Sequence, residues 1–196
     1  MYEYADKIIK LLHRYLIRVF PRIRALTTFD EINVLDTVNS VYSDIDRTIR
    51  RYFQMLAEQV YGDAFEGEML IPLAVEFLQR VFSEYNPVSK YVYINEFDRK
   101  RLRLVEALIA TGGDSVEADR AMKQIALMIG CYAIAVVDEA TLEAYRQEGV
   151  EKVRWISEED SKVCPVCKER NGNVYPINEL PPKPHYNCRC YFERVK

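Results

Sequence analysis

The stretch that decides the fold class is residues 30–56, which read DEINVLDTVNSVYSDIDRTIRRYFQML. Its apolar positions recur at alternating steps of three and four residues, the period of an amphipathic α-helix. These positions are Leu35, Val38, Tyr42, Ile45, Ile49, Tyr52 and Leu56. Thr27 to Asp30 supplies a helix-capping signal just before the run. Three heptads of one seam predict a long helix in an antiparallel bundle or hairpin, since a free-standing coiled coil usually needs a longer run.

Similar periodicity continues on both sides of this stretch. Residues 5–26 predict a helix with a kink or break near Phe20, because Pro21 lies inside it. Further helices are predicted over 68–85, 95–110 and 116–148, where Asp114 or Ser115 caps the last one and Gly149 ends it. Pro72 fits the first turn of the 68–85 helix. Cys131 lies in an apolar run and is interpreted as a small core residue.

The texture of the sequence changes after Gly149. Residues 151–156 alternate with the period of a strand, and prolines and a glycine then crowd residues 165–184, through which we expect no helix to run. We predict a helical domain over residues 1–150 and a Cys/His module over residues 151–196. The expected fold class is mainly α: a bundle of long helices followed by a small zinc-stapled module with short β-strands.

Composition narrows the class of protein. The 196 residues are 49% hydrophobic with a net charge of −3, which excludes collagen-like, low-complexity and wholly disordered chains. Charges interrupt the N-terminal apolar residues, and the longest uncharged apolar run, residues 125–137, is too short for a bilayer-spanning helix of about 20 residues. We therefore expect a soluble, cytoplasmic protein without a membrane partner, in which thiols stay reduced.

Four of the five cysteines fall in the predicted module and indicate a metal site. Cys164 and Cys167 form a C-x2-C pair typical of a zinc knuckle, and a second group of donors follows 17 residues later. The candidate ligands are Cys164, Cys167, His185, Cys188 and Cys190. Zinc takes four N or S donors, and the spacing leaves open which four bind. A closed site of this kind would be structural; the alternative is two disulfides or idle thiols.

A catalytic metal site would make the protein one of two kinds of enzyme. A zinc deaminase needs H-x-E ahead of P-C-x-x-C, and the only histidine before Cys164 is His13, so that class is excluded. An HNH-like or treble-clef nuclease, or a DNA-binding module of that type, is the more serious alternative. A nuclease would need His185 free to act as base while four cysteines hold the metal. The composition thus favours a protein that is not an enzyme.

The module also carries a family resemblance. The run V-R-W-I-S-x-x-D-x-x-V-C-x-x-C-x-x-x-x-G-x-V-Y followed by L-P-x-x-P-H-x-N-C-R-C resembles the C-terminal signature of the phage Mu F-like head morphogenesis family, and the similarity extends over about residues 95–190. Trp155, Asp160 and Gly172 are motif positions beside the five metal candidates. The resemblance implies a minor head protein of a tailed phage or prophage. Such a protein is made in the host cytoplasm and located inside the capsid near the portal vertex, with portal or capsid proteins as partners and double-stranded DNA as a further candidate.

Two segments are basic. Residues 1–24 hold six basic and two acidic side chains, and residues 89–103 hold five and two. The second segment concentrates Arg99, Lys100, Arg101 and Arg103 in nearly one helical turn. Such segments are candidate contacts with nucleic acid or an acidic partner, while the alternative is a solvated helix face whose charges pair with one another. Trp155 is expected to form the core of the module rather than a stacking platform.

Overall fold

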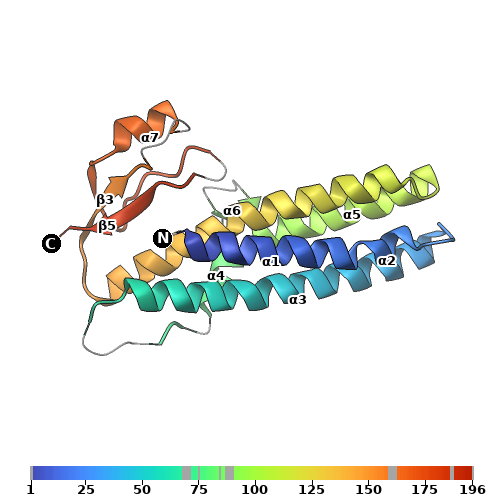
Figure 1. Cartoon of the computed structure of the whole chain (residues 1–196), viewed down its shortest axis with the longest axis horizontal. Coiled ribbons are helices and arrows are strands. Elements are labelled where there is room, and N and C mark those ends of the chain that lie inside the picture. The colour runs from blue at the N-terminus through green and yellow to red at the C-terminus, as the bar shows by residue number, and fades with distance from the viewer. Residues whose placement is uncertain are drawn as a thin grey trace.

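The computed structural model describes residues 2–67, 72–74, 76–83, 85–86, 91–158, 163–185 and 188–195. Within them, long helices lie side by side in an elongated bundle (Figure 1). These are α1 (Glu3–Val19), α3 (Glu31–Ala64), α5 (Tyr93–Thr111) and α6 (Ser115–Gln147). Short α2 (Pro21–Arg24) follows the break predicted at Phe20. The predicted mainly helical fold with a small sheet is confirmed.

Helix α3 forms the predicted seam and buries it against α1, α5 and α6. The Asp30 carboxylate caps the helix by accepting a hydrogen bond from the backbone N–H of Asn33 at 3.0 Å. Most seam positions are buried, but Tyr52 is only half-buried and the adjacent Phe53 is fully buried instead. The helix therefore follows the 3.6-residue period and rotates its buried face slightly along its length.

Helix α6 is the apolar centre of the bundle. Asp114 caps it by accepting from the N–H of Val116 at 2.9 Å, and Gly149, with a φ of 72°, lies just past its end. Cys131 is buried, as expected. The helix is long and apolar enough to cross a membrane, but 78% of its most apolar window is buried within the protein. Such burial is that of a core helix.

The helix predicted over 68–85 is wrong in its bounds. Residues 72–74 are not helical, α4 spans only Phe77–Ser83, and Tyr85 belongs to a short strand. Because a proline disfavours helical backbone in the residue before it, Pro72 opposes a helix that starts at Glu68. Residues 68–71, 75 and 84 lie outside the described residues. Strands β1 (Tyr85–Asn86) and β2 (Tyr91–Val92) pair in an antiparallel ladder ahead of α5.

No helix runs through residues 165–184, as expected, but a short helix that was not predicted lies at their start. Helix α7 spans Pro165–Arg170, directly after Cys164. Pro165 occupies the start of the helix, where its missing N–H is not needed and its fixed φ suits the helix. Gly172, with a φ of 82°, lies just beyond the end of α7. Pro165 and Gly172 thus mark the start and the end of a short helix and do not prevent it.

The C-terminal module is built on a three-stranded antiparallel sheet. β3 (Lys152–Ile156) lies between β4 (Val174–Pro176) and β5 (Tyr191–Arg194). Trp155 faces Phe192 across the ladder, with the two rings edge to face at 5.3 Å. Figure 1 shows the module at the end of the bundle where the N-terminus lies, opposite α2. Leu142 and Tyr145 of α6 belong to the same apolar cluster as Trp155, so the bundle supplies part of the module's core.

Candidate metal centre

Cys164 and Cys167 are positioned by the start of α7. The Sγ of Cys164 caps this helix by accepting a hydrogen bond from the backbone N–H of Cys167 at 3.3 Å. The cap holds both sulfur atoms on one side of the turn. Cys167 is buried, with 1% of its surface exposed, whereas Cys164 is partly exposed. The C-x2-C pair therefore forms the compact knuckle that its spacing predicts.

Cys188 and Cys190 precede β5 and point to the same side of the chain. Both are buried, while the intervening Arg189 is exposed and its guanidinium pairs with Asp6 at 2.5 Å. This alternation follows from the two-residue period of extended backbone. The pairing of β5 with β3 brings these residues to the knuckle.

The five predicted ligands form two overlapping triads that share Cys167. One triad is Cys164, Cys167 and His185, and the other is Cys167, Cys188 and Cys190; within each, the donor atoms lie within 4.8 Å of one another. Cys167 Sγ lies 3.5 Å from Cys188 Sγ and 3.9 Å from His185 Nε2. Two thiolates in a tetrahedral zinc site lie about 3.8 Å apart, because Zn–S is about 2.3 Å. The cluster can therefore hold a metal ion, and its donor chemistry fits zinc.

The thiols differ in acidity. Burial raises the pKa of Cys167 to about 12, and a hydrogen bond with Cys190 together with burial raises the pKa of Cys188. Burial also acts upward on Cys164, but the N–H of Cys167 and the imidazole of His185 outweigh it and lower the pKa. A bound divalent cation stabilises thiolates, so ion binding at this cluster releases protons. The five cysteines, all within the described residues, form no disulfide, and the 3.5 Å contact between Cys167 and Cys188 is far longer than an S–S bond of about 2.05 Å.

The remaining motif residues have structural surroundings. Trp155 is fully buried in the core of the module, as predicted, and the guanidinium of Arg170 lies 5.2 Å from its ring centroid. The N–H of Gly172 donates to the carbonyl of Trp155 at 2.8 Å, which ties the end of α7 to β3. Asp160 lies outside the described residues, so its motif role stays a prediction.

The histidines do not have the surroundings of a free general base. His185 lies among the candidate metal donors, and His13 contacts the carbonyl oxygen of Ala126 in the bundle at 3.2 Å. A nuclease of the HNH type needs one histidine at the metal that is not consumed as a structural ligand. The geometry thus favours the ligand role of His185.

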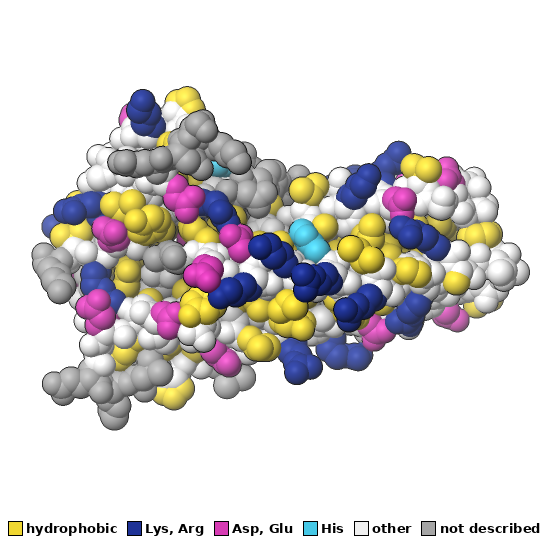
Figure 2. Space-filling view, in the orientation of Figure 1, with side chains coloured by type: hydrophobic (Ala, Val, Ile, Leu, Met, Phe, Trp, Pro, Cys, Tyr) yellow, Lys and Arg dark blue, Asp and Glu magenta, His cyan; other side chains and the backbone are white. Residues whose placement is uncertain are grey.

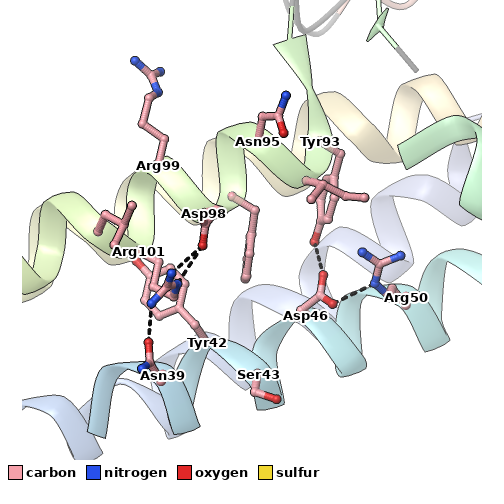
Figure 3. Close-up of a pocket in the computed structure, with 13 residues that line it drawn as sticks. Asn39, Tyr42, Ser43, Asp46, Arg50, Tyr93, Asn95, Asp98, Arg99 and Arg101 are labelled. Atoms are coloured by element: carbon pink, nitrogen blue, oxygen red, sulfur yellow. Dashed lines mark hydrogen bonds and ion pairs between the residues drawn. The ribbon is translucent and has the colours of Figure 1, made fainter. Parts of the chain in front are cut away.

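The basic cluster of α5 is largely neutralised by its own helix. Arg99 and Lys100 both pair with the buried Glu96 at 2.7 Å, and Arg101 pairs with Asp98 at 2.6 Å. Figure 3 shows Arg101 turned toward Asp98 and Asn39 in a groove of about 750 Å³ between α3 and α5, with Arg99 pointing away from α3. At the other end of the groove Asp46 accepts hydrogen bonds from Tyr93 and Arg50. Only Arg103 of the four predicted cations is exposed without an ion pair among the described residues.

A buried polar network next to the metal cluster was not predicted. Lys183 Nζ lies 2.5 Å from Asp138 Oδ2 in α6 and 2.9 Å from the hydroxyl oxygen of Tyr2, which precedes α1. All three residues are buried. The proline-rich sequence around Lys183 is typical of a solvent-exposed loop. The one sequence signal of a buried charge is the position of Asp138 directly after the apolar run 125–137.

Comparison with known proteins finds a family similar to the second half of the chain. Residues 100–193 match the family described as Phage Mu protein F like protein. This segment is similar to the Mu F-like family. No curated protein and no solved structure matches the chain. The matched segment runs from α5 through α6 to β5, so it includes the core helix of the bundle and all five candidate ligands of the Mu F-like module. The predicted resemblance is confirmed.

Proposed function

We propose that this Mu F-like protein is a minor head protein that acts in capsid assembly near the portal vertex. The family match over residues 100–193 is the observation that carries the proposal, because this family is one of phage head morphogenesis proteins and is structural rather than catalytic. The protein would be present in the host cytoplasm during assembly and then inside the capsid. Portal or capsid proteins are the expected partners.

The metal of the proposed head protein is zinc in a structural role. Sulfur and imidazole donors suit Zn²⁺, and five of them compete for four positions. Cys167, Cys188 and Cys190 are each at most 5% exposed, which leaves little room for the open, water-bearing position of a catalytic zinc. A module of about 45 residues rarely folds on core burial alone, so the bound ion would contribute directly to its folding.

A face of α1 is the surface that we propose for contact with packaged DNA. Lys10, Arg14 and Arg18 are exposed and form no ion pair with other described residues. Four-residue steps in a helix place them in a row about 6 Å apart. Figure 2 shows Lys and Arg side chains in a row along this face of the bundle. We call Lys10, Arg14 and Arg18 the α1 stripe; it offers more unpaired positive charge than the α5 cluster.

DNA contact is tested by titrating a 30-base-pair duplex at several salt concentrations. We expect Lys10→Gln, Arg14→Gln and Arg18→Gln together to weaken binding and to reduce the salt slope by about 2–3, since each phosphate contact contributes about 0.9. The control replaces Arg103, Lys152 and Arg154, which are also exposed, by Gln and removes the same charge. Equal effects of the two triple variants, or no duplex affinity of the native protein at about 50 mM salt, would exclude DNA contact through the α1 stripe.

Head assembly is tested by purifying proheads and virions made with and without the protein. We expect the protein in both particles and a loss of DNA-filled heads when its gene is deleted. Its absence from purified particles would contradict the proposal. Metal-dependent cleavage of duplex DNA that is lost in a folded His185→Ala variant would instead support the nuclease alternative.

A further inference from the structure

The ammonium group of Lys183 has all three of its N–H donors satisfied at the junction between module and bundle. They point to Asp138 Oδ2 at 2.5 Å, the hydroxyl oxygen of Tyr2 at 2.9 Å and the carbonyl oxygen of Cys188 at 3.1 Å. Only 3% of the Lys183 side chain and 8% of the Asp138 side chain are exposed. Burying a charge costs several kcal/mol unless such partners offset it. The position of Lys183 is therefore fixed by groups from three parts of the chain.

The same network reaches the backbone of two candidate metal ligands. Lys183 donates to the carbonyl of Cys188. The hydroxyl of Tyr2 lies 2.8 Å from the carbonyl of Cys190 and 2.9 Å from Asp138 Oδ1, so these two acceptors share its one proton. These contacts hold the main chain on both sides of Arg189, and hence the directions in which both Sγ atoms point. Hydrogen bonds that orient ligands in this way are a large part of what sets metal affinity.

Tyr2, directly before α1, also closes the first turn of that helix. Its carbonyl oxygen accepts a hydrogen bond from the N–H of Asp6 at 3.0 Å. Its ring lies 5.5 Å from Lys183 Nζ and 5.8 Å from the guanidinium carbon of Arg189, both in the module. The module therefore holds this turn through both the ring and the hydroxyl of one residue.

We propose that Lys183 and Tyr2 are positioning residues of the metal centre, through which metal binding is coupled to docking of the first turn of α1 on the module. The inference rests on the metal centre proposed above. Coupling between two such events is reciprocal: metal binding stabilises the docked turn by the same factor by which docking raises metal affinity, so loss of the docking lowers metal affinity. The α1 stripe begins two turns further along the same helix, so the metal centre and this surface share one element.

The first test measures zinc affinity of the full chain by competition with a chromophoric chelator. Tyr2→Phe removes only the hydroxyl, and we expect about tenfold weaker binding. Lys183→Met combined with Asp138→Leu removes both buried charges and leaves neither unpaired; we expect a loss of about 10- to 100-fold. The control is Asp6→Asn, which breaks the exposed ion pair of the same junction, with an expected change of less than twofold. The proposal would be overturned if Tyr2→Phe and the double variant both bound zinc within twofold of the native affinity. If the double variant does not fold, the zinc affinity of Tyr2→Phe decides the test.

The second test follows hydrogen exchange in the first turns of α1. We expect exchange around the N–H of Asp6 to rise at least tenfold when zinc is removed, and this zinc dependence to disappear in Tyr2→Phe. Equal exchange with and without zinc, in a chain that binds zinc, contradicts the coupling but leaves the metal centre standing. A native chain that takes up no zinc contradicts both.

Discussion

At the scale of single residues, Cys167 is the centre of the metal cluster. It is the one donor common to both triads, and it is the most deeply buried together with Cys188. The five candidate donors outnumber the four ligand positions of one zinc ion by one. Replacing Cys167 should therefore affect zinc binding more than replacing a donor that belongs to only one triad.

We expect Cys167→Ser to abolish zinc binding by the purified protein. Among Cys164→Ala, His185→Ala, Cys188→Ala and Cys190→Ala, one variant should retain close to one zinc per chain and the other three should not, because only four of the five donors bind. Elemental analysis after dialysis gives the stoichiometry and identifies the donor that does not bind. Retention of one zinc by Cys167→Ser would show that the shared position is not a ligand.

Glu96 in α5 is a buried carboxylate whose pKa depends on its burial and on two neighbouring cations. Burial raises its pKa, but hydrogen bonds from Arg99 and Lys100 outweigh burial, so the net pKa is lowered. A lowered carboxyl pKa contributes stability that is present above the unfolded pKa of about 4.3 and is lost as the pH falls through the folded pKa.

Glu96→Gln should therefore lower the free energy of unfolding by about 1.5 kcal/mol at pH 7, the magnitude of a hydrogen bond to a charged group. The difference from the native protein should shrink below pH 4. Urea unfolding at both pH values measures it. Asp98→Asn, which breaks a more exposed pair on the same helix, is the control and should change stability by less than about 0.5 kcal/mol. A loss that is the same at pH 3 and pH 7 would exclude an origin in the charge of Glu96.

At the scale of elements, α6 serves two cores. Its middle is buried in the bundle, while Leu142 and Tyr145 near its end pack with Trp155 and Phe192 of the module. The hydroxyl of Tyr145 also donates to the carbonyl of Phe192 at 3.3 Å. The module is thus anchored on a helix that the bundle holds rigid.

Leu142→Ala should destabilise the module by about 2–5 kcal/mol, because it removes a buried side chain and leaves a cavity. Trp155 is the only tryptophan of the chain, so its fluorescence reports unfolding of the module directly. Leu127→Ala, on the same helix but 58% exposed, is the matched control with an expected change within about 0.5 kcal/mol. Equal midpoints of the tryptophan transition in the two variants would contradict a shared core.

The elements also show where sequence periodicity is sufficient. The seam of α3, the break at Phe20 and the bounds of α6 follow from local patterns, since apolar spacing, a proline and a capping carboxylate act within one or two turns. Helix α7 was not expected, because Pro165 reads as a breaker unless its place at the helix start is known. The helix predicted over 68–85 was too long, because its apolar spacing was given more weight than the effect of Pro72 on the residue before it.

At the scale of the whole molecule, the metal module sits on the end of the bundle where α1 begins (Figure 1). Ion pairs and hydrogen bonds from Arg194 to Glu148 and from Arg189 to Asp6 flank the buried Lys183–Asp138 pair. The predicted boundary at residue 150 stays a prediction, and the contacts across it join residues separated by up to 188 positions.

The sequence by itself determined the helical class, the C-x2-C spacing with its five candidate donors, and the resemblance to the Mu F-like family, because each depends on residue types at short spacing. Only the tertiary structure decided which charges are free. It pairs Arg99, Lys100 and Arg101 with acids of their own helix and buries Lys183 against Asp138. The α1 stripe forms no ion pair with the rest of the described chain. Whether a charge is solvated, paired or buried depends on groups brought together from distant parts of the chain, and no local pattern encodes that proximity.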